Sequence, residues 1–336
     1  MLAHFYIDPE SVPNQRPVDR AARSLLLREI EEHGIAAGPR KNWLEILRRI
    51  PQSERKEWET TLRSLPIHDV SLDFHSPGDV TTILDSGTYS IVALTEEGLE
   101  TWERETGTKV DPARPVLRQS YGTETPVAEV LTIGLLSETE SLSNFREWNR
   151  NGIRNGDSRD QLWETRILPV LELSHSLNIV DRYFLKSLLA GSTKNQKVRD
   201  SAVHWLVSKF EQDLADHPIS LTIYTNKVSD LADLQVESTL LNHLREFAPN
   251  GIREIHCFVA KPNLREAIPH DRHWRTASQD WSSKFEFGSS VDLFNNSRIQ
   301  GDYTMRYSNL NHRERRALVD QEQRSQTMSF PEILVT

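Results

Sequence analysis

The feature that most constrains the fold is the alternation of apolar strands with amphipathic helices in the second half of the chain. The expected strands are short and rich in β-branched and aromatic residues: 177–184, 219–225, 252–259, 285–287 and 303–307. The expected helices carry apolar residues at helical spacing: 159–174, 198–215 and 229–247. This strand–helix–strand order predicts a parallel or mixed sheet covered by helices.

The first half of the chain predicts a separate α/β domain. Its expected elements are strands at 4–7, 67–74, 89–94 and 127–136 and helices that include 19–32 and 53–65. A polar stretch rich in Asn and Gly, 137–160, is the expected boundary, although 143–150 within it can still form a helix. We therefore expect an N-terminal α/β domain of unassigned role at 1–150, a second domain at 158–318, and a tail at 319–336. The tail ends in an apolar run, which we expect to dock on this chain or on a partner.

Length and charge limit the class of protein. The chain of 336 residues can hold two domains, and its net charge of −9 disfavours non-specific binding to nucleic acid or anionic membranes. Residues 251–316, which contain the candidate site, carry more Lys and Arg than Asp and Glu, unlike the chain as a whole. This excess of positive charge either belongs to a site or is ordinary variation of surface charge. The one cysteine, Cys257, excludes a disulfide within the chain. With neither a signal peptide nor a membrane span expected, the sequence predicts a cytosolic protein.

Residue types converge on one chemistry around His270 and Arg272. A His and a cation two residues apart on a strand point to the same face of the sheet. A turn follows at Gly288, Ser289 and Ser290. In this hypothesis His270 is a nucleophile or acid, Arg272 clamps a phosphate, and the turn supplies N–H and hydroxyl donors. The alternative is a structural His beside a plain Gly-Ser turn.

A second group of candidates follows one of the expected strands. Asp181, Arg182 and Tyr183 come at its carboxyl end, the usual place for a ligand in an open α/β sheet. Alternatively, Asp181 caps a helix and Tyr183 is an aromatic residue at the rim. Asp181 or Asp292 is also a candidate partner for Arg272 in a buried ion pair, which is the alternative to a phosphate clamp.

A third group lies directly after Arg272. His273, Trp274 and Arg275 combine a stacking surface with cations, which suits a nucleic-acid strand. The alternative is a half-buried Trp274 with solvated neighbours.

Metal and cofactor motifs are not evident in the sequence. Four acids of the first half, Asp8, Glu96, Glu97 and Asp111, are candidates for a Mg²⁺ site in a nuclease domain. Acids are common on protein surfaces, however, and we expect no metal and no cofactor. The sequence also lacks a phosphate-binding P-loop, a dinucleotide fingerprint, zinc-ligand spacing and a nucleophile elbow.

The motifs of the second half, taken in order, resemble a known family. They are similar to the phospholipase-D-like domain at the C-terminus of MIT-domain (microtubule interacting and trafficking) proteins, which also has stand-alone bacterial relatives. The motifs that carry the resemblance are 179–184, 223–226, 270–272, 285–288, 291–294 and 301–303. They cover about residues 159–310, and their most specific part is His-Asp-Arg followed by an aromatic-Gly-x-x-x-Asp-x-Phe block. No family is recognised in residues 1–150.

The resemblance implies a phospholipase-D-like fold, in which helices sandwich a mixed sheet, and a phosphate-binding site. Together with the residue chemistry, it gives catalytic roles to His270, Arg272 and Ser289. The expected substrate-binding residues are Asp181, Arg182, Tyr183, Trp274, Arg275, Gly288, Ser290 and Asp292.

Active members of the superfamily use two facing copies of a His-x-Lys-x4-Asp motif followed by Gly-Ser. This chain has one copy, with Arg272 in place of the Lys and Ala277 where the family has the acid. The resemblance therefore implies a homodimeric phosphodiesterase, a metal-independent nuclease, in which each chain supplies one motif. The stand-alone bacterial relatives imply an antiphage defence system, with nucleic acid and an operon-encoded protein as candidate partners.

Two other functions remain open. The departures from the family motif favour a catalytically inactive module that binds phosphate or a protein and acts as a sensor or adaptor. The other alternative places catalysis in the N-terminal half and makes the second half its regulator.

Overall fold

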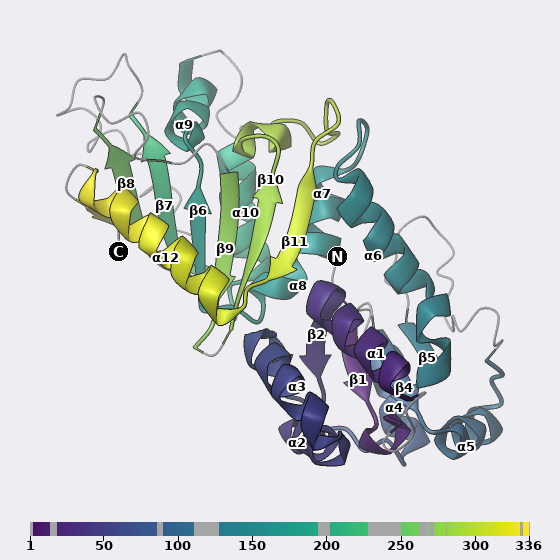
Figure 1. Cartoon of the computed structure of the whole chain (residues 1–336). Coiled ribbons are helices and arrows are strands. Elements are labelled where there is room, and N and C mark those ends of the chain that lie inside the picture. The colour runs from purple at the N-terminus through teal and green to yellow at the C-terminus, as the bar shows by residue number, and fades with distance from the viewer. Residues whose placement is uncertain are drawn as a thin grey trace. The chain divides into compact units, whose positions relative to one another are not determined.

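The computed structural model divides the chain into two compact units, Met1–Trp148 and Asn149–Thr336. The residues described are 3–13, 19–85, 90–110, 128–193, 202–227, 250–261, 268, 272–279, 281–329 and 332–335. Figure 1 labels the helices and strands of both units. The division falls close to the boundary expected at residue 150. Among these residues, no helix has the length and apolar character needed to cross a membrane.

The N-terminal unit is built on a five-stranded parallel sheet. Its strands are β1 (Ala3–Ile7), β2 (Gly34–Ala37), β3 (Ile67–His68), β4 (Ser90–Leu94) and β5 (Ala128–Thr132). The order across the sheet is β3-β2-β1-β4-β5, and every neighbouring pair is parallel. This order places β1 in the centre, with the chain winding outward on both sides. Such doubly wound sheets bind ligands beyond the carboxyl ends of their strands.

Helices cover both faces of this sheet. They are η1 (Pro9–Ser11), α1 (Asp19–His33), α2 (Arg40–Arg49), α3 (Gln52–Ser64), α4 (Pro77–Leu84), α5 (Glu96–Thr106), η2 (Ile133–Glu138) and α6 (Glu140–Asn151). Alternate residues of β1 enter different cores, since Phe5 packs with Trp58 of α3 whereas Tyr6 packs with Trp102 of α5. The two cores fix the helices on opposite faces and leave the strand ends accessible to loops.

The C-terminal unit is built on a seven-stranded mixed sheet. Its strands are β6 (Ser176–Val180), β7 (Ile219–Asn226), β8 (Ile252–Ala260), β9 (Arg272–Ala277), β10 (Ser282–Phe287), β11 (Met305–Asn309) and β12 (Ile333–Val335). The order is β11-β10-β9-β6-β7-β8-β12. The central strand β6 pairs parallel with β7 and antiparallel with β9. The mixed α/β sheet expected from the sequence is therefore present.

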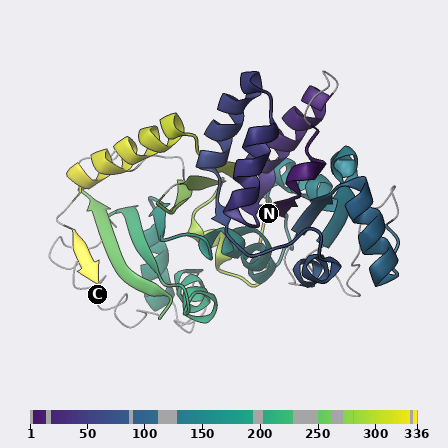
Figure 2. The same cartoon turned by 90° about the horizontal axis from the view of Figure 1, so that it is seen from below.

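Helices lie on both sides of this sheet as well. They are α7 (Arg159–Leu162), the π-helical turn η3 (Trp163–Ile167), α8 (Leu168–Leu171), α9 (Phe184–Thr193), α10 (Ala202–Asp213), η5 (Val291–Phe294) and α12 (His312–Thr327). Figure 2 shows α12 on one side of the strands and α9 and α10 on the other. The expected tail folds onto its own chain, because β12 pairs antiparallel with β8.

Several element boundaries differ from the sequence prediction. The strand predicted at 67–74 is only the two-residue edge strand β3, after which the carboxylate of Asp69 accepts a hydrogen bond from the backbone N–H of Arg40 at 3.2 Å and the chain leaves the sheet. The strand predicted at 127–136 ends at Thr132 because η2 follows. The polar stretch 137–160 contains α6, which buries Leu142 and Phe145. The helix predicted at 229–247 lies outside the described residues.

Candidate functional site

Strand directions bring the candidate residues of the C-terminal unit to one edge of the sheet. Strand β9 runs antiparallel to β6 and β10, with Val180 opposite His273 and Phe287 opposite Arg272. The amino end of β9 therefore lies beside the carboxyl ends of β6 and β10. As a result, Asp181, Arg272 and the Gly288 turn meet at the edge where open α/β sheets bind ligands.

Asp181 is the centre of this edge. Its Oδ1 accepts a hydrogen bond from the backbone N–H of Tyr183 at 2.9 Å, and its Oδ2 accepts from Ser290 Oγ at 2.7 Å and from Val291 N at 2.8 Å. The residue is only 2% exposed. Burial raises the pKa of Asp181, and the three hydrogen bonds and Arg272 oppose this shift. Asp181 thus holds the turn after β10 against the end of β6.

Arg272 places a cation beside this carboxylate. Its Nε lies 4.0 Å from Asp181 Oδ1, and its guanidinium carbon lies 5.2 Å from the ring centroid of Tyr183. The Nε atom is buried and finds no hydrogen-bond partner among the described residues. The Tyr183 side chain is exposed. A guanidinium that lies against an exposed ring at the carboxyl edge of a sheet suits an incoming anion.

Arg182 has a positioning role in this arrangement. Its Nε donates to the carbonyl of Ile268 at 2.6 Å, which ties the end of β6 to the segment before β9. Its own carbonyl accepts hydrogen bonds from Asn226 N at 3.2 Å and Thr225 Oγ1 at 3.3 Å. The guanidinium of Arg182 is therefore engaged with the chain itself.

The turn after β10 is shaped by close packing. The backbone N–H of Gly288 donates to the carbonyl of Thr304 at 2.9 Å, and a Cβ at this position would meet Thr304 Oγ1 at 2.4 Å. Ser289 is half-buried, whereas the hydroxyl of Ser290 is used by Asp181. Asp292 is exposed and accepts a hydrogen bond from Asn295 Nδ2 at 3.4 Å. Of the two acids considered for Arg272, Asp181 is the one that lies beside it.

The prediction of an exposed stacking patch at Trp274 and Arg275 is wrong, because both side chains are buried. Trp274 is 3% exposed and packs against Phe287, with ring centroids 4.9 Å apart. Arg275 faces the other side of β9 and donates twice to Glu322 of α12, from Nε at 2.7 Å and from Nη2 at 2.5 Å. Helices cover both faces of β9, so neither side chain offers a surface to a nucleic-acid strand.

Other predicted residues cannot be placed in the site. His270 lies outside the described residues, and so does Asp111. Of the other acids considered for Mg²⁺, Asp8 is buried and Glu96 and Glu97 begin α5. No group of three or more His, Cys, Asp or Glu suited to a metal ion occurs in the described part of the chain.

Two residues at the end of β7 belong to the site although the sequence analysis gave them no role. Thr225 Oγ1 accepts a hydrogen bond from Leu185 N at 3.1 Å and so fixes the start of α9. Asn226 has a buried Oδ1 with no hydrogen-bond partner among the described residues. The signal was available, because polar residues directly after a buried strand next to β6 fall at the same sheet edge.

No protein-family model and no curated protein sequence matches this chain. The chemistry of the edge therefore rests on its own residues. It combines a buried carboxylate, a guanidinium beside it, a hydroxyl at Ser289 and an exposed aromatic ring.

Proposed function

We propose that the C-terminal unit is a phospholipase-D-like phosphodiesterase, a metal-independent nuclease that acts as a homodimer. The observation that carries this proposal is the position of the Arg272 guanidinium, which lies beside the buried carboxylate of Asp181 and against the exposed ring of Tyr183, where a guanidinium can bind a phosphate. The mixed sheet flanked by helices supports the phospholipase-D-like fold. Its sheet edge also follows the general rule for ligand sites in α/β proteins.

In the proposed reaction, the imidazole of His270 attacks phosphorus while Arg272 binds the non-bridging oxygens. The phosphorus–oxygen bond to the leaving nucleoside breaks, and the second chain's His270 protonates that oxygen. Water then attacks the phospho-histidine, restores the imidazole and releases a phosphomonoester. One motif per chain makes a symmetric dimer necessary for this acid–base pairing.

A cleavage assay tests the proposal. The full chain is incubated in EDTA with end-labelled single- and double-stranded DNA and with RNA, while light scattering gives the mass in solution. We expect a dimer that cleaves at least one substrate, and we expect His270→Ala to abolish cleavage without changing mass or folding. Cleavage retained by His270→Ala would refute the site assignment.

A matched arginine variant isolates the phosphate clamp. Arg272→Ala should reduce cleavage by at least tenfold, since hydrogen bonds to charged groups contribute about 1.5–3 kcal/mol. Arg253→Ala is the control, because Arg253 lies at the amino end of β8, away from the proposed phosphate edge. Equal losses in the two variants would point to a general effect of positive charge.

The second candidate is a phosphate-binding module without catalysis. It is favoured by Ser290, whose hydroxyl is used by Asp181, and by Ala277 at the place of the family's acid. If this second candidate is correct, the chain binds a labelled oligonucleotide, Arg272→Ala weakens that binding, and no oligonucleotide is cleaved. Absence of both binding and cleavage would refute both candidates.

A cytosolic location, an operon-encoded partner and a role in antiphage defence complete the proposal. They rest on the sequence resemblance and on the single, buried Cys257. A plaque assay with the wild-type gene and with His270→Ala tests the defence role. Equal phage protection by the two genes would argue against a catalytic contribution.

A further inference from the structure

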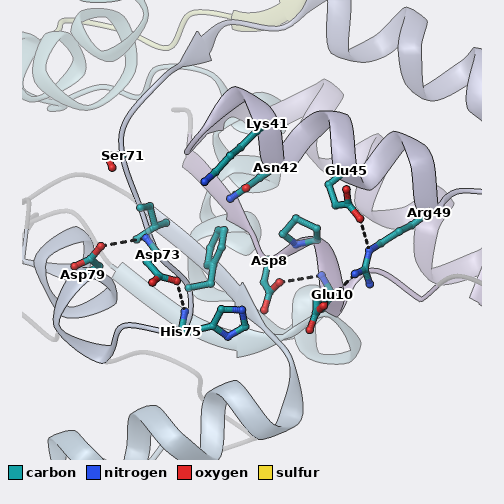
Figure 3. Close-up of a pocket in the computed structure, with 13 residues that line it drawn as sticks. Asp8, Glu10, Lys41, Asn42, Glu45, Arg49, Ser71, Asp73, His75 and Asp79 are labelled. Carbon is teal, nitrogen blue, oxygen red and sulfur yellow. Dashed lines mark hydrogen bonds and ion pairs between the residues drawn. The ribbon is translucent and has the colours of Figure 1, made fainter.

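The N-terminal unit has a cavity that the proposed phosphodiesterase does not use. Its volume is about 470 Å³, and it is lined by residues that follow β1, β2 and β3 (Figure 3). All three strands are parallel, so these residues gather at the carboxyl edge of the doubly wound sheet. A cavity of this size and place is typical of a small-molecule site.

One side of the cavity is suited to an anion. Helix α2 begins there, and its first turn carries no acid; the carboxylate of Asp69 accepts a hydrogen bond from the backbone N–H of Arg40 at 3.2 Å, and Lys41 and Asn42 follow it. Lys41 and Asn42 belong to that first turn, and their side chains extend from the helix into the hollow (Figure 3). No ion pair within the described residues engages the Lys41 ammonium. A helix N-terminus with a lysine and an amide is a favourable place for a phosphate.

The floor of the cavity holds a buried acceptor. Asp8 directly follows the central strand β1 and is 3% exposed. Its Oδ1 accepts a hydrogen bond from Glu10 N at 2.9 Å, whereas no hydrogen bond within the described residues reaches Oδ2. Its carboxylate lies next to the imidazole of His75 (Figure 3). A sugar hydroxyl can donate to such an oxygen.

The remaining charges at the two ends of the cavity are engaged within the chain. Arg49 forms ion pairs with Glu10 at 3.0 Å and Glu45 at 3.3 Å. At the other end, Asp79 accepts hydrogen bonds from Ser76 Oγ and Asp73 N, both at 3.1 Å, and Asp73 Oδ1 accepts one from His75 N at 3.0 Å. Lys41, Asn42 and Asp8 are therefore the groups that we assign to a ligand.

An apolar wall completes the cavity. Leu72 and Phe74 line it and are mostly buried, and His75 adds a flat imidazole ring. A planar base can pack against such a wall. The cavity thus offers separate surfaces for an anion, a hydroxyl and a planar apolar group.

We propose that this cavity binds a nucleoside monophosphate. The phosphate lies at the start of α2 on Lys41 and Asn42, a ribose hydroxyl donates to Asp8, and the base packs against Phe74 and His75.

Titration calorimetry on the full chain in EDTA tests this proposal with AMP, adenosine and inorganic phosphate. We expect AMP to bind most tightly. Lys41→Ala should weaken AMP binding by roughly tenfold or more, since a hydrogen bond to a charged group contributes about 1.5–3 kcal/mol, and it should leave adenosine binding unchanged. Asp8→Asn keeps the acceptor for Glu10 N and should weaken both AMP and adenosine.

Two controls locate the bound ligand. Lys56→Ala removes an exposed lysine of α3 that does not line the cavity, and it should not change the affinity for AMP. Arg272→Ala removes the proposed clamp of the C-terminal unit, and the AMP binding that depends on Lys41 should persist in this variant. AMP binding that depends on Arg272 but not on Lys41 would overturn the inference, as would no binding of AMP at millimolar concentration. Neither result would bear on nuclease activity, so the two proposals fail separately.

Discussion

Removing the carboxylate of Glu322 should detach α12 from the sheet of the C-terminal unit. This carboxylate accepts two hydrogen bonds from Arg275 and a third from Asn178 Nδ2 at 2.7 Å. Glu322 is 4% exposed and Arg275 is 8% exposed. The variant Glu322→Leu therefore leaves a guanidinium buried without a counter-charge and an amide without its acceptor.

The expected cost follows from that geometry. Breaking a buried ion pair by removing one partner destabilises a protein by about 3–5 kcal/mol, because the remaining charge stays desolvated. For a unit of this size, 1 kcal/mol shifts the melting temperature by about 2–4 °C, so we expect a fall of roughly 6–20 °C. The double variant Arg275→Met with Glu322→Leu removes both charges and should recover most of the loss.

Urea unfolding and calorimetric melting of the C-terminal unit measure this effect. Asp320→Asn is the matched control, because it removes an exposed carboxylate from the same helix and should change the free energy of unfolding by less than about 0.5 kcal/mol. A loss below about 1 kcal/mol for Glu322→Leu, or no recovery in the double variant, would refute the view that this network holds α12.

Three other predictions concern pH, packing and the site. Burial, followed by repulsion from His68, lowers the pKa of His4 to about 3, so between about pH 6.5 and pH 3 the unfolded state binds one more proton. The N-terminal unit should lose about 1.4 kcal/mol per pH unit through His4 as the pH falls across that range, and urea unfolding at pH 7 and pH 5 should show a smaller loss for His4→Leu. Gly152 has φ +68°, and a Cβ there would meet the carbonyl oxygen of Tyr303 at 2.2 Å. We therefore expect Gly152→Ala to lower the midpoint of urea unfolding. The control Gly134→Ala should lower it less, because its added Cβ meets nothing within 4 Å. Tyr183→Ala should weaken phosphate binding several-fold in calorimetry through loss of the ring under Arg272, whereas Tyr183→Phe should retain it.

The sequence was sufficient to predict the parallel core of the C-terminal unit. Strands β6, β7 and β8 carry β-branched and other apolar residues between polar stretches, and the amphipathic helices predicted between them indicate parallel crossovers. The strand order of the N-terminal unit could not be predicted from the sequence pattern. Strand β2 has four residues and begins with Gly34, which the local pattern identifies only as the end of a helix.

The sequence predicted which residue types meet at the candidate site, but not which of their side chains are exposed to solvent. Alternation along β9 correctly separates Arg272 from Arg275, but it does not reveal what covers each face. The partner of Arg275 is Glu322, which lies 47 residues further along the chain. Pairing between residues so far apart in the sequence leaves no local signal. The sequence analysis therefore assigned the buried Arg275 to nucleic-acid binding.

The pairing of β6 has a consequence for synthesis of the chain. The hydrogen bond between Asp181 and Ser290 joins residues that are 109 positions apart. A growing chain completes β6 at Val180 long before β9 begins at Arg272, and until then one long side of β6 has no strand to pair with. Open strand edges are templates for aggregation. A product that stops before residue 272 would leave this edge of β6 unpaired and would lack Arg272, so we expect early termination to favour aggregation.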